Sequence, residues 1–152
     1  MSFADLMGSQ NKQGEKRILT FLEVAGMFQA AEYNKRDCML LKCLYYLGLK
    51  SSEVQNLRVE DADFESCKVK VFKGDKKTSR YVSIPEGFGE ELRGFVNGKM
   101  GYIFSGGSNG LVSDRHVRRL VKAYACKAEI QKWSEINPHS LREAYFHHLN
   151  NI

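Results

Sequence analysis

The chain has 152 residues, of which 43% are hydrophobic and 27% are charged, an ordinary composition for a folded protein. This length supports one domain with its own core, and two prolines in the whole sequence argue against a long disordered linker. The 23 lysines and arginines exceed the 18 acidic residues, for a formal net charge of +5. Such an excess favours a polyanionic partner only where the positive charge is concentrated on part of the surface.

The polar N-terminus and the lack of long apolar runs argue against a secreted protein and against a membrane protein. Residues 1–17 are polar and aperiodic, so we interpret them as a flexible lead-in or linker stub before a domain over residues 18–152. The sequence shows no apolar run long enough for a signal peptide or a transmembrane helix. We therefore expect a cytoplasmic protein with no membrane partner.

The cysteine pattern argues against a metal centre. The four cysteines are Cys38, Cys43, Cys67 and Cys126. Their spacing matches no zinc motif, so we expect core thiols in a reducing compartment rather than disulfides or metal ligands.

The first part of the domain has helical patterns. Thr20 and Glu23 form a capping box, and the apolar residues that follow predict a helix over about residues 20–31. A second helix follows from Asn34 and contains CMLLKCLYYLGL, which is apolar on nearly every face. This pattern indicates the central helix of the core, and Gly48 ends it.

The pattern then changes from helical to alternating. Ser51 is expected to cap a short helix, SSEVQNL. The stretch KVKVFKGDKKTSRYVSIP predicts two strands, over residues 67–72 and 80–84, joined by a basic loop that contains glycine. Pro85 closes the second strand, and a further helix is predicted over residues 86–96.

The last third of the chain is again helical. YIF is expected to be a short extended piece and SGGSNG a loop. Ser113 caps a strong helix, SDRHVRRLVKAYACKA, and Asn137 with Pro138 starts the last helix. The sum of these elements is an α+β fold, mainly helical, with a small antiparallel β-sheet.

Positive charge is concentrated on two of these elements. The helix from Ser113 has one apolar face, and the opposite face is cationic. The cations of that face are Arg115, Arg118, Arg119 and Lys122. The predicted hairpin carries further cations, among them Lys73, Lys76, Lys77 and Arg80. This sorting favours a nucleic-acid partner, although the solvated faces of a soluble protein would give a similar pattern.

Three stretches are informative in combination: LYYLGLKSSEVQNLRVEDADF, VFKGDKKTSRYVSIP and NPHSLREAYFHHL. In order and approximate spacing they resemble the catalytic domain of the tyrosine recombinase (phage integrase) family. The resemblance runs from about Leu19 to the last residue, and it implies the integrase catalytic-domain fold. It also implies a site-specific recombinase that binds double-stranded DNA.

The resemblance implies DNA recombination and DNA integration by metal-independent strand cleavage and rejoining. In the family a tyrosine hydroxyl attacks a phosphodiester and forms a 3′-phosphotyrosine, without a metal or another cofactor. Arginines and a histidine stabilise charge on the phosphate, and a general acid protonates the leaving oxygen. By resemblance the catalytic residues are His139 and Arg142 at the H-x-x-R positions, Lys73 as general acid, and Lys50 at the first arginine position.

The sequence departs from the family pattern at two residues and at its end. Lys50 keeps a positive charge but lacks the planar fork that binds two phosphate oxygens at once. Glu143 stands where the family often has histidine. Tyr145 aligns with a packing aromatic of the family, and the sequence ends at Ile152, before the position of the family's nucleophilic tyrosine.

These departures leave the status of the chain as an enzyme open. We expect an incomplete catalytic domain that binds DNA but does not cleave it alone, as a monomer that would form a tetramer on DNA within the complete protein. The alternative is a noncatalytic DNA-binding remnant or regulator. The expected DNA-binding residues are Lys76, Lys77, Arg80, Arg115, Arg118, Arg119 and Lys122.

A zinc site that joins His147 or His148 to His139 is not expected, and His148 is interpreted as structural.

Overall fold

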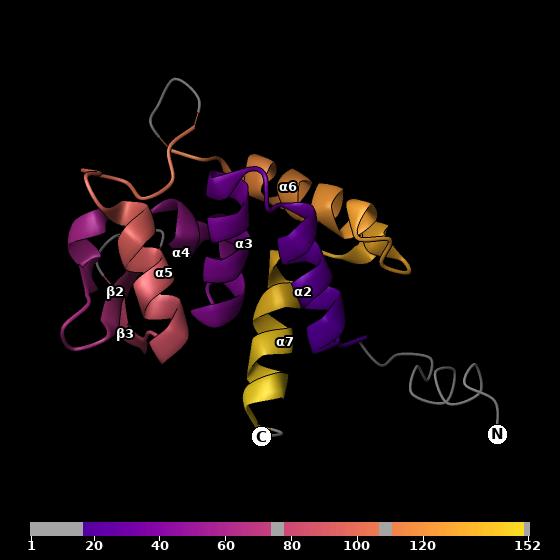
Figure 1. Cartoon of the computed structure of the whole chain (residues 1–152), viewed down its shortest axis with the longest axis horizontal. Coiled ribbons are helices and arrows are strands. Elements are labelled where there is room, and N and C mark those ends of the chain that lie inside the picture. Colours follow the sequence, from indigo (N-terminus) through magenta and orange to yellow (C-terminus); the bar gives the residue numbers. More distant parts are fainter. Residues whose placement is uncertain (1–16, 74–77, 107–110, 151–152) are drawn as a thin grey trace.

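A computed structural model describes residues 17–73, 78–106 and 111–150 of the chain (Figure 1). The helices are α2 (Phe21–Ala30), α3 (Lys35–Tyr46), α4 (Ser51–Gln55), α5 (Glu86–Val96), α6 (Asp114–Lys127) and α7 (Pro138–Asn150). The strands are β1 (Ala62–Asp63), β2 (Lys68–Phe72) and β3 (Ser79–Ser83), with 3₁₀ turns η1 (Val59–Asp61) and η2 (Trp133–Glu135). The predicted lead-in up to residue 16, Lys76 and Lys77 lie outside the described residues.

The local signals at the starts of α2 and α6 act as predicted. Thr20 Oγ1 accepts the N–H of Glu23 at 3.1 Å, and Glu23 Oε1 accepts the N–H of Thr20 at 3.0 Å. Ser113 Oγ accepts the N–H of His116 at 3.0 Å and caps α6. Each cap satisfies N–H groups that have no partner within the helix, so both helices begin where the sequence indicates.

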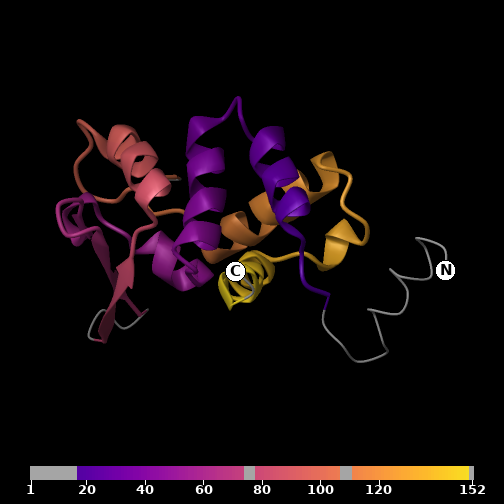
Figure 2. The ribbon, with the colours of Figure 1, turned by 60° about the horizontal axis from the view of Figure 1, so that its bottom comes forward.

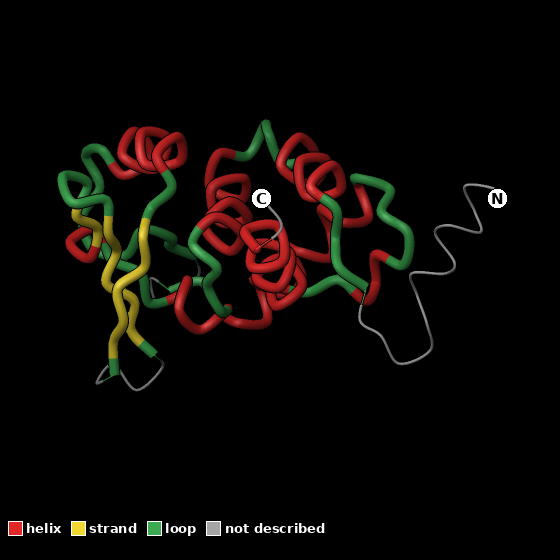
Figure 3. The backbone as a smooth tube through the Cα atoms, turned by 90° about the horizontal axis from the view of Figure 1, so that it is seen from below, coloured by secondary structure: helices red, strands yellow, loops and turns green. Residues whose placement is uncertain are grey.

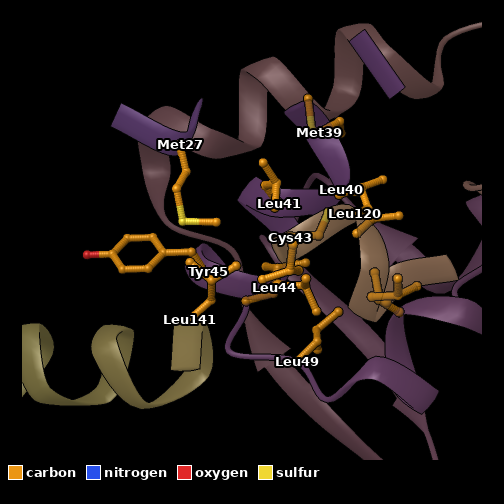
Figure 4. Close-up of a cluster of buried hydrophobic side chains, with 14 of the residues drawn as sticks. Met27, Met39, Leu40, Leu41, Cys43, Leu44, Tyr45, Leu49, Leu120 and Leu141 are labelled. Carbon is orange, nitrogen blue, oxygen red and sulfur yellow. The ribbon is translucent and has the colours of Figure 1, made fainter. Parts of the chain in front are cut away.

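Helix α3 is the centre of the core, as predicted from its apolar sequence. Its buried side chains include Met39, Leu40, Leu41, Cys43 and Leu44 (Figure 4). Helices α2, α4, α5 and α7 all pack against α3, because a helix that is apolar on nearly every side must be covered on nearly every side. Within the described ranges, no helix is both long and apolar enough to cross a bilayer.

The prediction that all four cysteines are core residues is wrong for two of them. Cys43 is buried and Cys38 is half-buried, whereas Cys67 and Cys126 are exposed. Cys67 lies in the turn before β2 with a φ of 56°, and Cys126 lies on a solvent-facing side of α6. All four thiols are free, and burial raises the pKa of the Cys43 thiol, which makes it unreactive.

The sheet has the antiparallel order β1-β2-β3 and lies with α5 at one end of the helical body (Figures 1 and 3). In β2 the side chains of Val69 and Val71 are buried, whereas Lys68 is exposed and Lys70 is half-buried. Strand β1 was not predicted, because two residues are too few to show an alternating pattern. The extended piece predicted at YIF forms a bridge between Tyr102 and Arg58 and belongs to no named strand.

Candidate nucleic-acid interface

A pocket of about 420 Å³ lies where the first residues of α4, α6 and α7 meet. Figure 2 shows these three helices, in magenta, orange and yellow, converging below α3. The lining residues that bear on its chemistry are Lys50, Ser51, Asp114, Arg118, Asn137 and His139. Two of the predicted catalytic residues, Lys50 and His139, thus share one concavity although 89 positions separate them in the sequence.

The turn before α4 presents Lys50 to this pocket. Gly48 ends α3 with a φ of +58°, a left-handed conformation that glycine adopts without a steric penalty. Lys50 then stands at the N-cap position, and the carboxylate of Glu53 accepts its backbone N–H at 2.8 Å. The prediction that Ser51 caps α4 is therefore wrong, because the glutamate reaches back and takes that role.

Arg142 holds the same turn from the other side. Its Nε donates to the carbonyl oxygen of Gly48 at 3.0 Å, and its guanidinium lies 5.0 Å from the ring centroid of Phe146. Arg142 is half-buried behind the turn and is not among the residues that line the pocket. It therefore lies next to the predicted site and fixes the backbone that carries Lys50.

A buried ion pair ties β3 to this turn. Glu53 is 2% exposed and accepts from Arg80 Nη2 at 3.0 Å and from Arg80 Nε at 3.2 Å. Burial alone would raise the pKa of Glu53, but the hydrogen bonds from Arg80 and from the backbone of Lys50 outweigh it and hold the pKa below the usual 4.5. Glu53 is thus ionised at neutral pH and connects the hairpin to the site.

Sequence reasoning placed Arg80 among the DNA contacts and gave Glu53 no role. In the structure the guanidinium of Arg80 is engaged with Glu53, so a contact with DNA stays a prediction. The alternation of exposed and half-buried residues along β3 could have shown that Arg80 faces the protein rather than solvent. Arg80 lies two residues before Val82 and opposite Val71, on the strand face that turns toward the helices.

His139 lies at the start of α7, where the predicted cap is present. Asn137 Oδ1 accepts the N–H of Ser140 at 3.2 Å, so Asn137 begins the helix. The side chain of His139 is 52% exposed, and its Nε2 lies 2.6 Å from Oε1 of Glu143 one turn later. Glu143, which departs from the family pattern, therefore acts on His139 directly.

Lys73 lies apart from this pocket. It is exposed at the end of β2, and its backbone N–H donates to the carbonyl of Thr78 at 3.0 Å across the hairpin. Its side chain does not line the pocket. The structure thus brings Lys50 and His139 together, places Arg142 beside them, and leaves Lys73 on the hairpin.

The four cations of α6 have different surroundings. Arg115 and Arg119 are exposed, and Lys122 donates to the carbonyls of Ser134 and Ile136 at 2.8 and 3.3 Å. The ammonium of Lys122 thus ties α6 to the segment before α7. Arg118 is the member of this group that lines the pocket.

Asp114 is a second acidic residue that sequence reasoning missed. Arg118 Nε donates to Asp114 Oδ2 at 2.8 Å, across one turn of α6. The hydroxyl of Ser51 and then the guanidinium of Arg118 hold the pKa of Asp114 below its usual value. The i, i+4 spacing of the pair was visible in the sequence, but its position on the pocket wall was not.

Tyr145 and His148 make packing contacts and hydrogen bonds within the helical core. The Tyr145 ring packs edge-on against Tyr45 at a centroid distance of 5.4 Å, and burial raises the pKa of its hydroxyl. His148 contacts the Tyr45 hydroxyl through Nδ1 at 2.6 Å and the Leu19 carbonyl through Nε2 at 2.9 Å. The described residues contain no cluster of three or more ligands suited to a metal ion.

Comparison with known proteins decides the family. The model of the phage integrase family matches residues 17–152. The chain belongs to this family. A tyrosine recombinase of Pseudothermotoga lettingae is 33% identical over 147 residues, which cover 93% of this chain and 51% of that protein. The tyrosine recombinase XerA of Thermococcus kodakarensis is 31% identical over 128 residues, which cover 76% of this chain and 42% of that protein.

Solved recombinase structures have the same fold. The crystal structure of XerA recombinase matches with a TM-score of 0.76 and 22% identity, over 88% of this chain and 50% of that one. XerH site-specific recombinase bound to its difH substrate matches with a TM-score of 0.72 and 16% identity, over 90% of this chain and 43% of that one. The predicted integrase catalytic-domain fold is confirmed. The chain spans about half the length of the curated relatives it matches.

Proposed function

We propose that this domain binds duplex DNA and holds one backbone phosphate for the strand cleavage and rejoining of a site-specific tyrosine recombinase. The observation that carries the proposal is the pocket shared by Lys50, Arg118 and His139, which come from three helices. Cationic side chains in a concavity offer fixed donors to the charge that develops on a phosphodiester during transesterification. Two of these residues belong to the motifs that resemble the family.

Each predicted catalytic residue has a role in this proposal. Lys50 and His139 contact the nonbridging oxygens, and Arg142 contributes positive charge from behind the turn at Gly48. Nε of Arg142 is used by that turn, and no described acceptor takes its terminal nitrogens, which stay available for the anion. Lys73 would protonate the leaving oxygen once DNA brings the hairpin and the pocket onto the same phosphate.

The surroundings of the pocket are suited to a DNA strand. Arg115 and Arg119 on α6 are exposed, so they can contact flanking phosphates without breaking internal bonds. Among the structural relatives, XerH is bound to difH and lambda integrase to its core site. By this analogy we propose a monomer in isolation and an assembly on DNA, a tetramer in the complete protein.

The first test measures the affinity for duplex DNA as salt is varied. Exchanging Arg115 and Arg119 together for glutamate should weaken binding at least about tenfold, because each lost phosphate contact removes roughly 0.9 from the slope of log affinity against log salt. The control exchanges Lys35 and Lys99, which are exposed at the start of α3 and three residues after α5, and should change the affinity by less than about threefold. An affinity that did not fall as salt rose would contradict the proposal.

The second test asks whether the chain cleaves DNA by itself. We expect residues 1–152 to form no covalent adduct with a nicked suicide duplex, because Tyr145 is packed against Tyr45 and burial disfavours its phenolate. The nucleophile would then come from a segment other than α7. An adduct that Tyr145→Phe abolishes would reverse this assignment. A bound but uncleaved duplex, even when a tyrosine-bearing segment is supplied, would favour the noncatalytic DNA-binding alternative.

A further inference from the structure

The pocket contains a guanidinium that the family motifs do not supply. Arg118 comes from α6, which lies between the second and third motif, and it lines the same concavity as Lys50 and His139. We propose that Arg118 provides, from α6, the planar fork that is lost where lysine occupies position 50. This inference rests on the proposed phosphate-binding function and deepens it.

The ion pair with Asp114 leaves most of the fork available. Only Nε of Arg118 donates to Asp114, and no described residue accepts from its two terminal nitrogens. A guanidinium has five N–H donors, so four remain, and the edge formed by the two terminal nitrogens can still bind two oxygens at once. Asp114 therefore limits the freedom of the guanidinium without using the donors that a phosphate needs.

The carboxylate of Asp114 does not make the pocket unsuitable for an anion. It is compensated by Arg118 one turn later on the same helix. Lys50 adds a positive charge from α4, and the imidazole of His139 adds a polar contact from α7. Asp114 is also the first residue of α6, where the free N–H groups of the helix offset a negative charge. Among the residues that line the pocket, two cations thus face one carboxylate, while Glu143, which contacts His139, lies outside the lining.

Ser51 supplies a second observation that favours an anion in this pocket. Ser51 lines the pocket, and its buried hydroxyl lies beside Asp114, where it helps to lower the pKa of that carboxyl, but it makes no well-aligned hydrogen bond with a described residue. A buried hydroxyl is stabilised by a well-aligned acceptor. A phosphate oxygen held between Lys50 and Arg118 would accept from this hydroxyl.

The neighbouring cations of α6 provide a matched control. Arg115 and Arg119 have the same charge on the same helix, yet neither lines the pocket. A general electrostatic effect of α6 would make the three arginines equivalent. If the Arg118 guanidinium binds the phosphate directly, its removal should lower phosphate affinity more than removal of either of the other two arginines.

The experiment titrates the whole chain with inorganic phosphate and follows the backbone amide resonances of Ser51, Ser52 and His139. Arg118→Ala should weaken phosphate binding at least about fivefold, whereas Arg119→Ala should change it by less than about 1.5-fold, in keeping with the strength of bidentate guanidinium pairs. Both side chains are exposed, so dispersed amide spectra should show that both variants fold.

A second pair of variants tests whether an arginine at position 50 can replace the arginine at position 118. In the Arg118→Ala background, Lys50→Arg should recover most of the lost phosphate affinity, and it should raise the affinity of the wild-type background much less. An equal gain in both backgrounds would show that the two positions act independently and would overturn the inference.

The outcomes separate this inference from the proposed function. If Lys50→Ala and His139→Ala weaken phosphate binding but Arg118→Ala does not, the pocket binds phosphate without the fork, and the inference alone fails. If the wild-type chain shows no saturable shift of these resonances, both the inference and the phosphate-binding role of the pocket are overturned.

Discussion

Arg80→Ala should lower the free energy of unfolding by about 3 kcal/mol at neutral pH, near the lower limit for breaking a buried ion pair. The reason lies in Glu53, which is 2% exposed and would keep its charge without its main partner. The loss stays near that limit because the Arg80 side chain is itself 39% exposed. Chemical denaturation monitored by circular dichroism measures the difference directly.

The pH dependence of this loss identifies its cause. In the wild-type protein the pKa of Glu53 is lower in the folded than in the unfolded state, so the pair contributes fully above the usual value of 4.5. Its contribution is lost as pH falls through the folded pKa. In Arg80→Ala, burial acts without the arginine and favours the protonated acid. The difference in stability between the two proteins should therefore shrink as the pH falls from 7 toward about 3.5.

A second substitution serves as the control. Adding Glu53→Gln to Arg80→Ala removes the uncompensated charge but keeps an oxygen that can accept the backbone N–H of Lys50. We expect the double variant to recover at least about half of the lost stability. A loss that does not change with pH, or that Glu53→Gln does not relieve, would show that the pair stabilises the fold through packing rather than charge.

Leu141→Ala should destabilise the protein by about 2 to 5 kcal/mol, the usual range for a leucine truncated in a core. Leu141 is fully buried and reaches from α7 toward Leu44 and Tyr45 of α3 (Figure 4). It lies between His139 and Arg142 in the sequence, so its packing sets the position of the helix that carries both. Phosphate binding should therefore weaken together with stability.

The same helix contains the matched control. Leu149 is 50% exposed, so Leu149→Ala should change the free energy of unfolding by less than about 1 kcal/mol and leave phosphate binding unchanged. Thermal or chemical unfolding of both variants measures the contrast. Equal effects of the two truncations would mean that α7 is not held in place by its buried face.

The elements that sequence reasoning located correctly are those with strong local signals. The capping box of Thr20 and Glu23, the apolar run of α3 and the cap at Ser113 depend on residues within one or two turns of each other. Strand β1 and the surroundings of Cys67 and Cys126 were missed because they depend on distant partners or on single exposed positions. The three motifs were sufficient to indicate the family.

By itself, the sequence determined the helices, the hairpin, the family and the identity of the cations, because periodicity, caps and motif spacing are properties of neighbouring residues. Only the tertiary structure decided which cations act together. It engages Arg80 with a buried carboxylate, uses Lys122 to join two segments, and places Arg118 in a pocket with Lys50 and His139. The physical reason is that every lysine and arginine has the same charge in sequence, and burial and distance alone determine what each one contacts.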